Sequence, residues 1–428
     1  MAAPLVKPGA ADALLAKLRL PKGGVWASEA RAKALARLQA MGLPGRRDEY
    51  WKYTDPARLT GPDAAPAALL QTDEAPVFGG LDRLKLVFVD GAFDAGASDD
   101  LRLSGVEIDR LATAAARDIH WAKDIYGVLE ACGQKPVARP LAALNTACAT
   151  DGVLIRVTGK LARPVSLVYH RRSPGSDVVL HHVIKLEAGA ALTLLENGPA
   201  AARFNSCMEV EVAAGASFHH IRLQGRDHER IAATHLFAQI GAEAVFKSFT
   251  LTANGHLTRN EAVLDIVGDG ALAHIAGASL GDGAFHHDDT VFVTHDAAGC
   301  ESRQVYKKVL RNGATGVFQG KILVKQGAQQ TDGYQISQAL LLDEDSQFLA
   351  KPELEIYADD VKCSHGSTSG AIDETALFYL RSRGVPAAEA TDLLVLAFLA
   401  EALDEIEDER VRADIQGRLE AWLARRRG

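Results

Sequence analysis

The sequence of 428 residues is longer than the roughly 250–300 residues at which a single globular core usually stops growing, so we expect several domains or one elongated solenoid. Hydrophobic residues make up 47% of the chain, which excludes an intrinsically disordered protein. The net charge is −8, and charges of both signs are spread along the chain without a basic patch. This distribution argues against nucleic acid as a partner.

The five cysteines are odd in number, far apart and without a CxxC pair. This pattern argues against a disulfide framework and a closed zinc site, and it is typical of reduced thiols in a cytoplasmic protein. Lys7, Asp12 and Lys17 interrupt the apolar N-terminal residues, and the apolar stretch 393–400 is short, so we expect neither a signal peptide nor a membrane span. Four cysteines are expected to be buried structural thiols: Cys132, Cys148, Cys207 and Cys300.

Residues 1–150 are expected to form a mainly helical N-terminal domain. Residues 28–41 repeat Ala, Leu and Arg at helical spacing and are followed by the helix-ending sequence Gly-Leu-Pro-Gly. Residues 56–84 have no clear period and are expected to form a loop, whereas the apolar run 84–89 predicts a short strand. Between 107 and 132 the apolar residues return to helical spacing and predict a further helix.

Residues 151–370 show short alternating strand patterns separated by small-residue turns that recur every 26–29 residues. Such a near-constant period is typical of a solenoid. We therefore expect a mainly β fold, a right-handed parallel β-helix with two or more strands per coil. The alternative is an irregular antiparallel sandwich, in which turns are expected every ~8–12 residues. The turns begin at Gly189, Gly215, Gly241, Gly270, Gly299 and Gly327.

Residues 371–428 are expected to form a C-terminal helical domain, whose removal should leave the β-helix folded. Asp373 is typical of a helix start, Gly384 of its end, and Pro386 of the first turn of the next helix. That next helix, up to about residue 403, is strongly apolar, and a last helix at 408–425 is highly charged.

The most informative motif is residues 351–366, KPELEIYADDVKCSHG. It resembles the C-terminal signature of the SufB/SufD family of iron–sulfur cluster assembly proteins, and Cys363-Ser364-His365-Gly366 resembles the form in the SufD branch. SufB proteins carry a Glu-His-Glu type element at this place and lack the Trp-Lys-Tyr-Thr element found here at 51–54. The resemblance covers about residues 46–400 and implies a parallel β-helix between helical regions. Its other blocks are 49–54 (EYWKYT), 144–145, 151–152, 302–304 (SRQ), 306–307, 317–322 (VFQGKI), 331–332 and 378–384 (FYLRSRG).

A nascent iron–sulfur cluster needs soft thiolate ligands, with imidazole or carboxylate groups as weaker ones. Cys363 and His365 stand two residues apart, so on a strand both side chains point to the same face. Asp359 and Asp360 are further candidates, as ligands for incoming iron or as hydrogen-bond partners of the imidazole. The resemblance implies that His365 helps to form the assembly site at the SufB–SufD interface, opposite a SufB cysteine. From the residues alone, Cys363 is equally well a buried apolar side chain.

The chain has no GxxxxGK[ST] motif, so ATP hydrolysis must come from a partner. The resemblance implies a non-catalytic scaffold subunit that binds SufB through an edge of the β-helix and SufC, an ABC-type ATPase, through the C-terminal helices. It also implies a transient cluster or iron at the SufB interface and leaves a reduced flavin open. An open sheet edge also predicts a homodimer when SufB is absent. The expected SufC contacts are Phe378, Tyr379, Arg381, Arg383, Leu396 and Phe398.

Other polar clusters are expected to lie on solvated surfaces. Adjacent histidines on a strand face opposite sides, so at most one of each pair can join a given metal site. Two other functions remain open: a passive solenoid adaptor, and a secreted polysaccharide-active β-helix enzyme that uses acidic pairs at 288–289 or 359–360. The clusters are His181-His182, His219-His220, His286-His287 with Asp288-Asp289, and the basic residues Arg303, Lys307 and Lys308.

Overall fold

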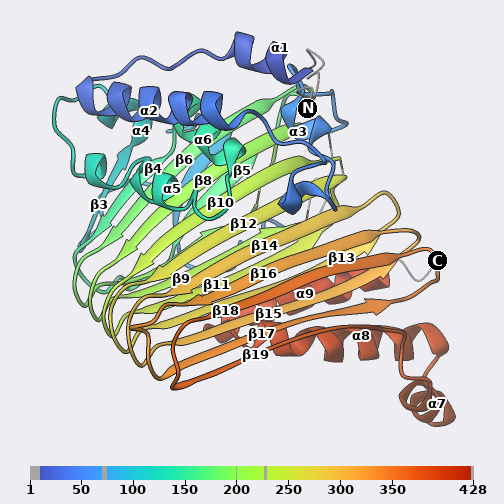
Figure 1. The fold of residues 1–428 in the computed structure, drawn as a ribbon. Coiled ribbons are helices and arrows are strands. Elements are labelled where there is room, and N and C mark those ends of the chain that lie inside the picture. The colour runs from blue at the N-terminus through green and yellow to red at the C-terminus, as the bar shows by residue number, and fades with distance from the viewer. Residues whose placement is uncertain (1–9, 70–74, 199, 226–228, 426–428) are drawn as a thin grey trace, which may run out of the picture.

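A computed structural model describes residues 10–69, 75–198, 200–225 and 229–425 (Figure 1). Lys7 and residues 70–74 of the expected loop lie outside these ranges. None of the described helices has both the length and the apolar character that a bilayer span requires. The helices are α1 (Ala10–Lys17), α2 (Val25–Met41), α3 (Ala57–Thr60), α4 (Leu111–Ala114), α5 (Val128–Cys132), α6 (Pro140–Cys148), α7 (Glu374–Ser382), α8 (Ala387–Leu403) and α9 (Glu409–Ala424), with short 3-10 helices η1 (Glu49–Trp51) and η2 (Trp121–Asp124).

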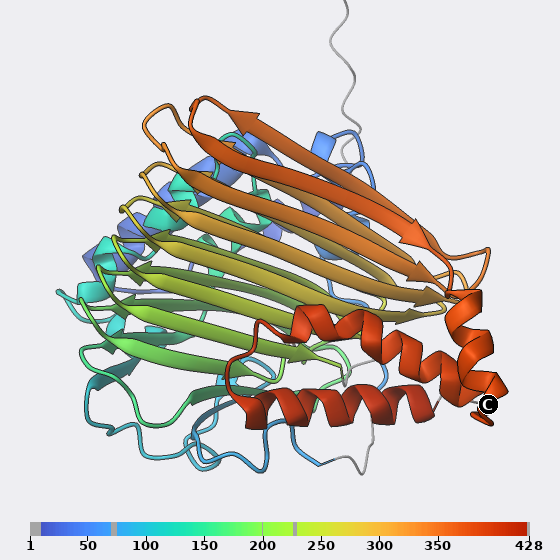
Figure 2. The ribbon, with the colours of Figure 1, turned by 90° about the horizontal axis from the view of Figure 1, so that it is seen from below.

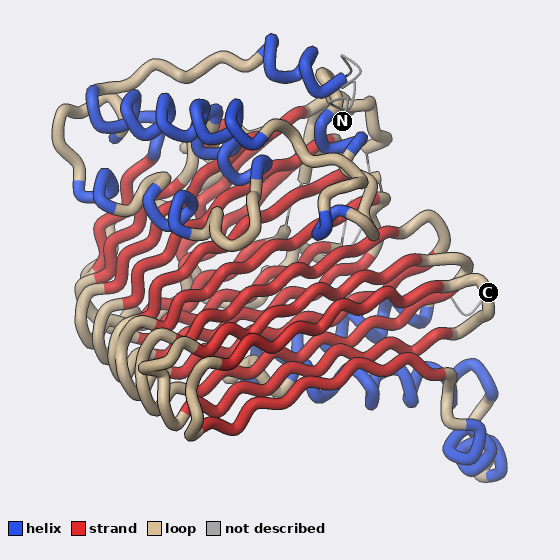
Figure 3. Tube along the Cα trace, in the orientation of Figure 1, coloured by secondary structure: helices blue, strands red, loops and turns tan. Residues whose placement is uncertain are grey.

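The strands form two long sheets that face each other (Figure 3). The ten-stranded sheet has the order β19-β17-β15-β13-β11-β9-β7-β5-β1-β2, and the nine-stranded sheet has the order β18-β16-β14-β12-β10-β8-β6-β4-β3. The strands are β1 (Leu84–Val89), β2 (Ala92–Phe93), β3 (Val106–Arg110), β4 (Val153–Val157), β5 (Val165–His170), β6 (Asp177–Leu186), β7 (Ala191–Glu196), β8 (Arg203–Val212), β9 (Ser217–Gln224), β10 (Ile231–Ile240), β11 (Val245–Ala253), β12 (Leu257–Ile266), β13 (Leu272–Asp282), β14 (His286–His295), β15 (Glu301–Arg311), β16 (Thr315–Val324), β17 (Thr331–Leu341), β18 (Gln347–Ile356) and β19 (Val361–Gly370).

From β4 onward, consecutive strands alternate between the two sheets, and neighbouring strands within each sheet are parallel. Each pair of consecutive strands is therefore one coil of a β-solenoid. The predicted parallel β-helix is confirmed, and the antiparallel sandwich is wrong.

The predicted turns lie at the corners of the coils. Four of the six turn glycines have the left-handed backbone that glycine adopts without steric cost, with φ between 66° and 71°. In the other two turns Glu243 (φ 55°) and Gln330 (φ 59°) take this conformation instead. The four glycines are Gly189, Gly215, Gly270 and Gly299.

The sheets begin before residue 151. The predicted strand at 84–89 is confirmed as β1, which pairs in parallel with β5. The single helix predicted for 107–132 is wrong, because that segment holds β3, two short α-helices and a 3-10 helix. Strand β3 pairs antiparallel with β4, and its alternate residues Val106 and Ile108 pack against the solenoid core. Their tertiary packing outweighs the local helical spacing.

Helices cover the outer faces of both sheets, while the inner faces enclose the main core. Helices α8 and α9 lie side by side on the outer face of the ten-stranded sheet (Figure 2), where they bury a row of apolar strand residues. The N-terminal helices lie over the nine-stranded sheet (Figure 1). Both sides of each sheet are therefore shielded along much of the solenoid. The strand residues under α8 and α9 include Leu223, Phe249, Leu251, Leu280, Val305 and Val309.

This double coverage corrects the expectation that the histidine pairs are surface groups. His182 faces the interior, where its Nε2 lies 3.1 Å from the Tyr169 hydroxyl, and burial lowers its pKa to about 4. Its neighbour His181 faces outward, yet it is fully buried and hydrogen-bonds Glu209 at 2.7 Å. The prediction that adjacent histidines face opposite ways is confirmed for this pair, but both side chains are buried.

Polar residues inside the solenoid form a hydrogen-bonded chain along its axis. The chain begins where Tyr169 donates to Glu196 (2.8 Å), and it ends where Lys308 donates to Asp289 (2.6 Å). Burial opposes ionisation of Glu196, but its basic neighbours outweigh this effect and hold the pKa of that carboxyl below its ordinary value. The members between the two ends are His220, Arg222, Thr234, Asn260 and His287.

The family block at 144–152 joins the N-terminal helices to the first coils. The Asn145 side chain donates to the backbone carbonyls of Leu180 and Asn205, both at 3.0 Å. Gly152 passes so close to the next coil that a Cβ there would lie 1.7 Å from the His181 carbonyl oxygen. Only glycine fits at this contact.

Candidate functional site

The solenoid ends in a coil whose two strands, β18 and β19, are each the last strand of a sheet. Within the described ranges, no strand pairs with the free edge of either one. An exposed edge presents unpaired backbone groups that a further strand can pair with. The described part of the chain therefore leaves two unpaired strand edges at this end of the solenoid.

Cys363 and His365 stand two residues apart on β19, so their side chains share a face. This face is the inner one, because Cys363 packs near the buried Ile322 across the solenoid. The Cys363 thiol lies over Gly333 of the preceding coil, with Sγ 3.2 Å from the place a Cβ would take there, and it packs near Ile322. Burial raises the pKa of this thiol, and the Asp332 carboxylate adds to the rise. Cys363 is thus a half-buried thiol rather than a freely exposed ligand.

His365 is exposed, and no hydrogen bond to its ring is found among the described residues. The next inner-face residue, Ser367, lies 2.8 Å from Ser337 of the preceding coil, so this face of β19 stands directly over β17. The exposed Asp359 and Asp360 precede the strand. At about 3.3 Å per residue of extended chain, Asp360 and Asp359 lie about 16–20 Å from His365.

The expected SufC contacts divide into two groups. Helix α7 has no buried residue and projects from the body (Figure 1), with Phe378 72% and Tyr379 55% exposed. Arg381 and Arg383 are also exposed. In contrast, Leu396 and Phe398 on α8 are only partly exposed and pack against the apolar cluster over the ten-stranded sheet. The exposed set on α7 is therefore the more available surface.

Residues 49–54, the EYWKYT block, form a strap across the outer face of the nine-stranded sheet. The Tyr50 hydroxyl donates a hydrogen bond to Glu353 on the terminal strand β18. The Arg259 guanidinium of β12 lies 4.0 Å from the centroid of the Trp51 ring. The strap therefore connects the coil that contains β12 to the terminal coil that contains β18. The motif alone did not indicate this role.

The acidic pair considered for a polysaccharide-active enzyme is buried. Asp288 accepts a hydrogen bond from Thr54 (2.6 Å) and pairs with Arg259, while Asp289 pairs with Lys308 at 2.6 Å. Both carboxylates are engaged inside the fold, so this pair is not available to a sugar substrate.

The basic residues of β15 are not a solvated face, contrary to expectation. Lys308 points inward and is 1% exposed. Lys307 points outward but is buried beneath α8, where it pairs with Glu401. Arg303 is partly exposed and donates to Asp332 at 2.8 Å. Two of the three charges are thus paired beneath the surface, Lys307 with Glu401 of α8 and Lys308 with Asp289 inside the solenoid.

The other thiols differ in burial. All five cysteines are free, and Cys207 and Cys300 are buried as expected. Cys148 is half-buried, and burial raises its pKa to about 11. Cys132 is exposed at the end of α5, so the expectation of a buried thiol is wrong there.

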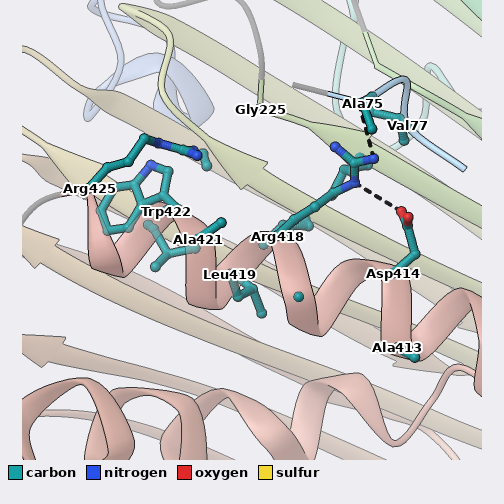
Figure 4. Close-up of a pocket in the computed structure, with 15 residues that line it drawn as sticks. Ala75, Val77, Gly225, Ala413, Asp414, Arg418, Leu419, Ala421, Trp422 and Arg425 are labelled. Carbon is teal, nitrogen blue, oxygen red and sulfur yellow. Dashed lines mark hydrogen bonds and ion pairs between the residues drawn. The ribbon is translucent and has the colours of Figure 1, made fainter. Parts of the chain in front are cut away.

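A cavity of about 370 Å³ lies between α9 and the ten-stranded sheet (Figure 4). Its Arg418 is already engaged, because it donates to Asp414 (2.9 Å) and to the carbonyls of Ala75 (3.3 Å) and Pro76 (2.9 Å). Trp422 at the other end donates to Asn254 at 3.2 Å. These contacts hold α9 in place and do not mark a ligand site.

In the described part of the chain, one group of three side chains has the proximity of metal ligands: Glu107, Asp109 and His120. Asp109 accepts two hydrogen bonds from Arg117, at 3.1 and 3.2 Å. The His120 ring accepts from the Ala122 amide at 3.1 Å and contacts Asp109 through its other nitrogen at 3.2 Å. His120 therefore caps the short helix η2 and Asp109 pairs with Arg117, so two of the three side chains are already engaged.

Comparison with known proteins agrees with this architecture. Residues 170–398 match the family described as "SUF system FeS cluster assembly, SufBD core domain", and residues 25–166 match the SufBD protein N-terminal region. The iron–sulfur cluster assembly protein SufD of Escherichia coli (strain K12) is 30% identical over 405 residues, which cover 90% of each chain. The protein named SufD in Bacillus subtilis (strain 168) is 26% identical over 410 residues, covering 91% of this chain and 92% of its own. A SufBD family protein of Synechocystis sp. is 28% identical over 417 residues, covering 89% and 87%. The chain therefore belongs to the SufBD family of SUF-system iron–sulfur cluster assembly proteins and is SufD-like.

Proposed function

We propose that this chain is a non-catalytic scaffold subunit that assembles iron–sulfur clusters together with a SufB subunit and the ATPase SufC. The observation that carries the proposal is the placement of two metal donors on an unpaired strand. The Cys363 thiol and the His365 imidazole share the inner face of β19, at the open end of the solenoid. A SufB chain that extends the sheets beyond this end meets both groups.

In this proposal His365 binds iron and a SufB cysteine supplies the main thiolate. Neutral imidazole is a competent iron ligand, and an incomplete ligand set on each subunit suits a cluster that must be released. Cys363 is secondary, because a thiol whose pKa is raised has less of the thiolate form that binds metal. Asp359 and Asp360 serve as weak ligands for incoming iron. The cluster is transient cargo of a cytoplasmic complex. Any reduced flavin acts in that complex, and the isolated chain holds no cofactor tightly.

The test compares complexes carrying His365→Ala with wild type and with the control Ser364→Ala, an exposed neighbour on the opposite face of β19. His365→Ala should leave the melting temperature and the bound partners nearly unchanged, since surface substitutions usually shift stability by only ~0.5 kcal/mol. Iron and acid-labile sulfide recovered from cells should fall, with a smaller fall for Cys363→Ser. Normal cluster maturation in His365→Ala, or a loss explained entirely by misfolding, would contradict the proposal.

We assign SufC docking to α7 rather than to α8. Deleting residues 371–428 is not a clean test of this assignment. The deletion uncovers the apolar strand residues beneath α8 and α9, so we no longer expect the solenoid to stay soluble without them. Light scattering tests the proposal that the unpaired edges of β18 and β19 bind another chain. The isolated chain should dimerise through these edges when SufB is absent. A strict monomer at high concentration would count against that assignment.

A further inference from the structure

Two buried glutamines lie directly behind the proposed ligand His365. Gln304 on β15, Gln335 on β17 and His365 on β19 occupy one register position on three neighbouring strands. Gln335 Nε2 donates to Gln304 Oε1 at 2.9 Å, and both side chains are fully buried. Within the described residues, Gln304 Nε2 and Gln335 Oε1 have no hydrogen-bond partner. A buried polar atom without a partner is unfavourable, so each of these two needs an explanation.

From the direction of the Gln335–Gln304 bond we infer that the unpartnered oxygen is directed toward the strand that carries His365. In a stacked amide ladder, the N–H and C=O groups of one side chain point to opposite neighbours along the stack. Since Gln335 Nε2 points to β15, its Oε1 points to β19. Ser337 and Ser367 touch across the next inner-face position at 2.8 Å, which shows that side chains of β17 and β19 reach each other at matching positions.

The strands around Gln335 leave space for this arrangement. Gly320 on β16 faces the amide, and a Cβ at that position would lie only 2.4 Å from Gln335 Nε2. Both Gln304 and Gly320 belong to the family blocks at 302–304 and 317–322 that the proposed ligand set did not use. The ladder gives these two residues a common physical role.

We propose that Gln335 is a positioning residue for His365. The two groups are not bonded in this structure. When the exposed imidazole turns toward β17, Gln335 Oε1 accepts its N–H and holds the ring in one tautomer, so that the other nitrogen carries the lone pair that binds iron. Neutral imidazole has one donor and one acceptor nitrogen, and metal-bound histidines usually donate their N–H to a fixed acceptor. Asp359 and Asp360 lie too far from His365 along the extended strand to supply this acceptor. The inference rests on the proposed function of His365.

Gln335→Met removes the acceptor at nearly constant length, and Gln304→Met is the matched control. The control breaks the same amide–amide bond one strand further from the site, so a purely structural ladder predicts equal effects. The first readout is nitrogen NMR of the full chain labelled with ¹⁵N-histidine, at alkaline pH where free imidazole is neutral. The His365 signal is identified by its loss in His365→Ala.

Gln335→Met should change the tautomer ratio of His365 about fivefold, the weight of one net hydrogen bond. Gln304→Met should change the ratio less, because it loosens the Gln335 amide but keeps the acceptor oxygen. Complexes purified from cells should retain about tenfold less iron with Gln335→Met and normal iron with Gln304→Met. Equal ratios in wild type and Gln335→Met, or equal shifts in both variants, would overturn the inference. A tautomer that depends on Gln335 in a protein whose His365→Ala variant matures clusters normally would overturn the proposed function alone.

Discussion

The pair Lys308–Asp289 provides a direct test of the solenoid's polar interior. The Nζ of Lys308 lies 2.6 Å from Asp289 Oδ2, and the two side chains are 1% and 5% exposed. Replacing Lys308 by Met fills the space but leaves a buried carboxylate without its cation. Removing one partner of a buried ion pair typically costs about 3–5 kcal/mol, so Lys308→Met should lower the unfolding free energy by about that amount.

The chain offers a matched surface control for this variant. Lys325 and Asp296 form the same type of pair at the same 2.6 Å, but their side chains are 48% and 44% exposed. An exposed pair contributes about 0–1 kcal/mol, so Lys325→Met should leave stability nearly unchanged. Urea unfolding followed by circular dichroism measures both variants. Adding Asp289→Asn to Lys308→Met should restore part of the loss. A Lys308→Met midpoint equal to that of Lys325→Met would refute the reasoning.

Three further outcomes follow from the structure. Because burial lowers the pKa of His182 to about 4, the folded state resists protonation, so its stability should fall as pH drops from about 6.5 to 4, by on the order of 3 kcal/mol, and His182→Gln should flatten this slope in thermal melts. Gly152→Ala should abolish soluble expression because its Cβ meets the His181 carbonyl oxygen, whereas Gly159→Ala, whose nearest contact is at 3.8 Å, should be tolerated. Replacing Phe378 and Tyr379 together by Ala should weaken SufC binding at least tenfold in pull-down titrations without changing the circular dichroism spectrum, since both side chains are exposed.

The coil architecture could be predicted because each coil must turn at a fixed interval. Glycine at 189, 215, 270 and 299 marks those corners, and their spacing identifies the repeat without any knowledge of the strand pairing. The burial of the histidine pairs could not be predicted in this way. Alternation assigns His181 to the outer face, but only the fold of the distant N-terminal segment determines that the outer face is covered there.

The candidate site shows the same division. The two-residue spacing of Cys363 and His365 predicts a shared face, because it depends only on the local strand. The position of Gln335 behind His365 depends on the pairing register of β17 and β19, which the length of the intervening coil determines. The spacings of 31 and 30 residues between Gln304, Gln335 and His365 are a weak sequence signal of this stack.

The position of α8 and α9 constrains how the chain can fold during synthesis. Leu223, Leu251 and Leu280 form part of the outer apolar face of the ten-stranded sheet, and the helices that cover them are the last described elements. About 140 residues separate Leu280 from the end of α9, so a ribosome adding about 5–20 residues per second leaves this face uncovered for on the order of 10 s. During that interval the nascent chain presents an apolar surface to chaperones. Chains that stop near residue 370 never bury it, so incomplete translation products should be recognised and degraded before they can occupy a place in a complex.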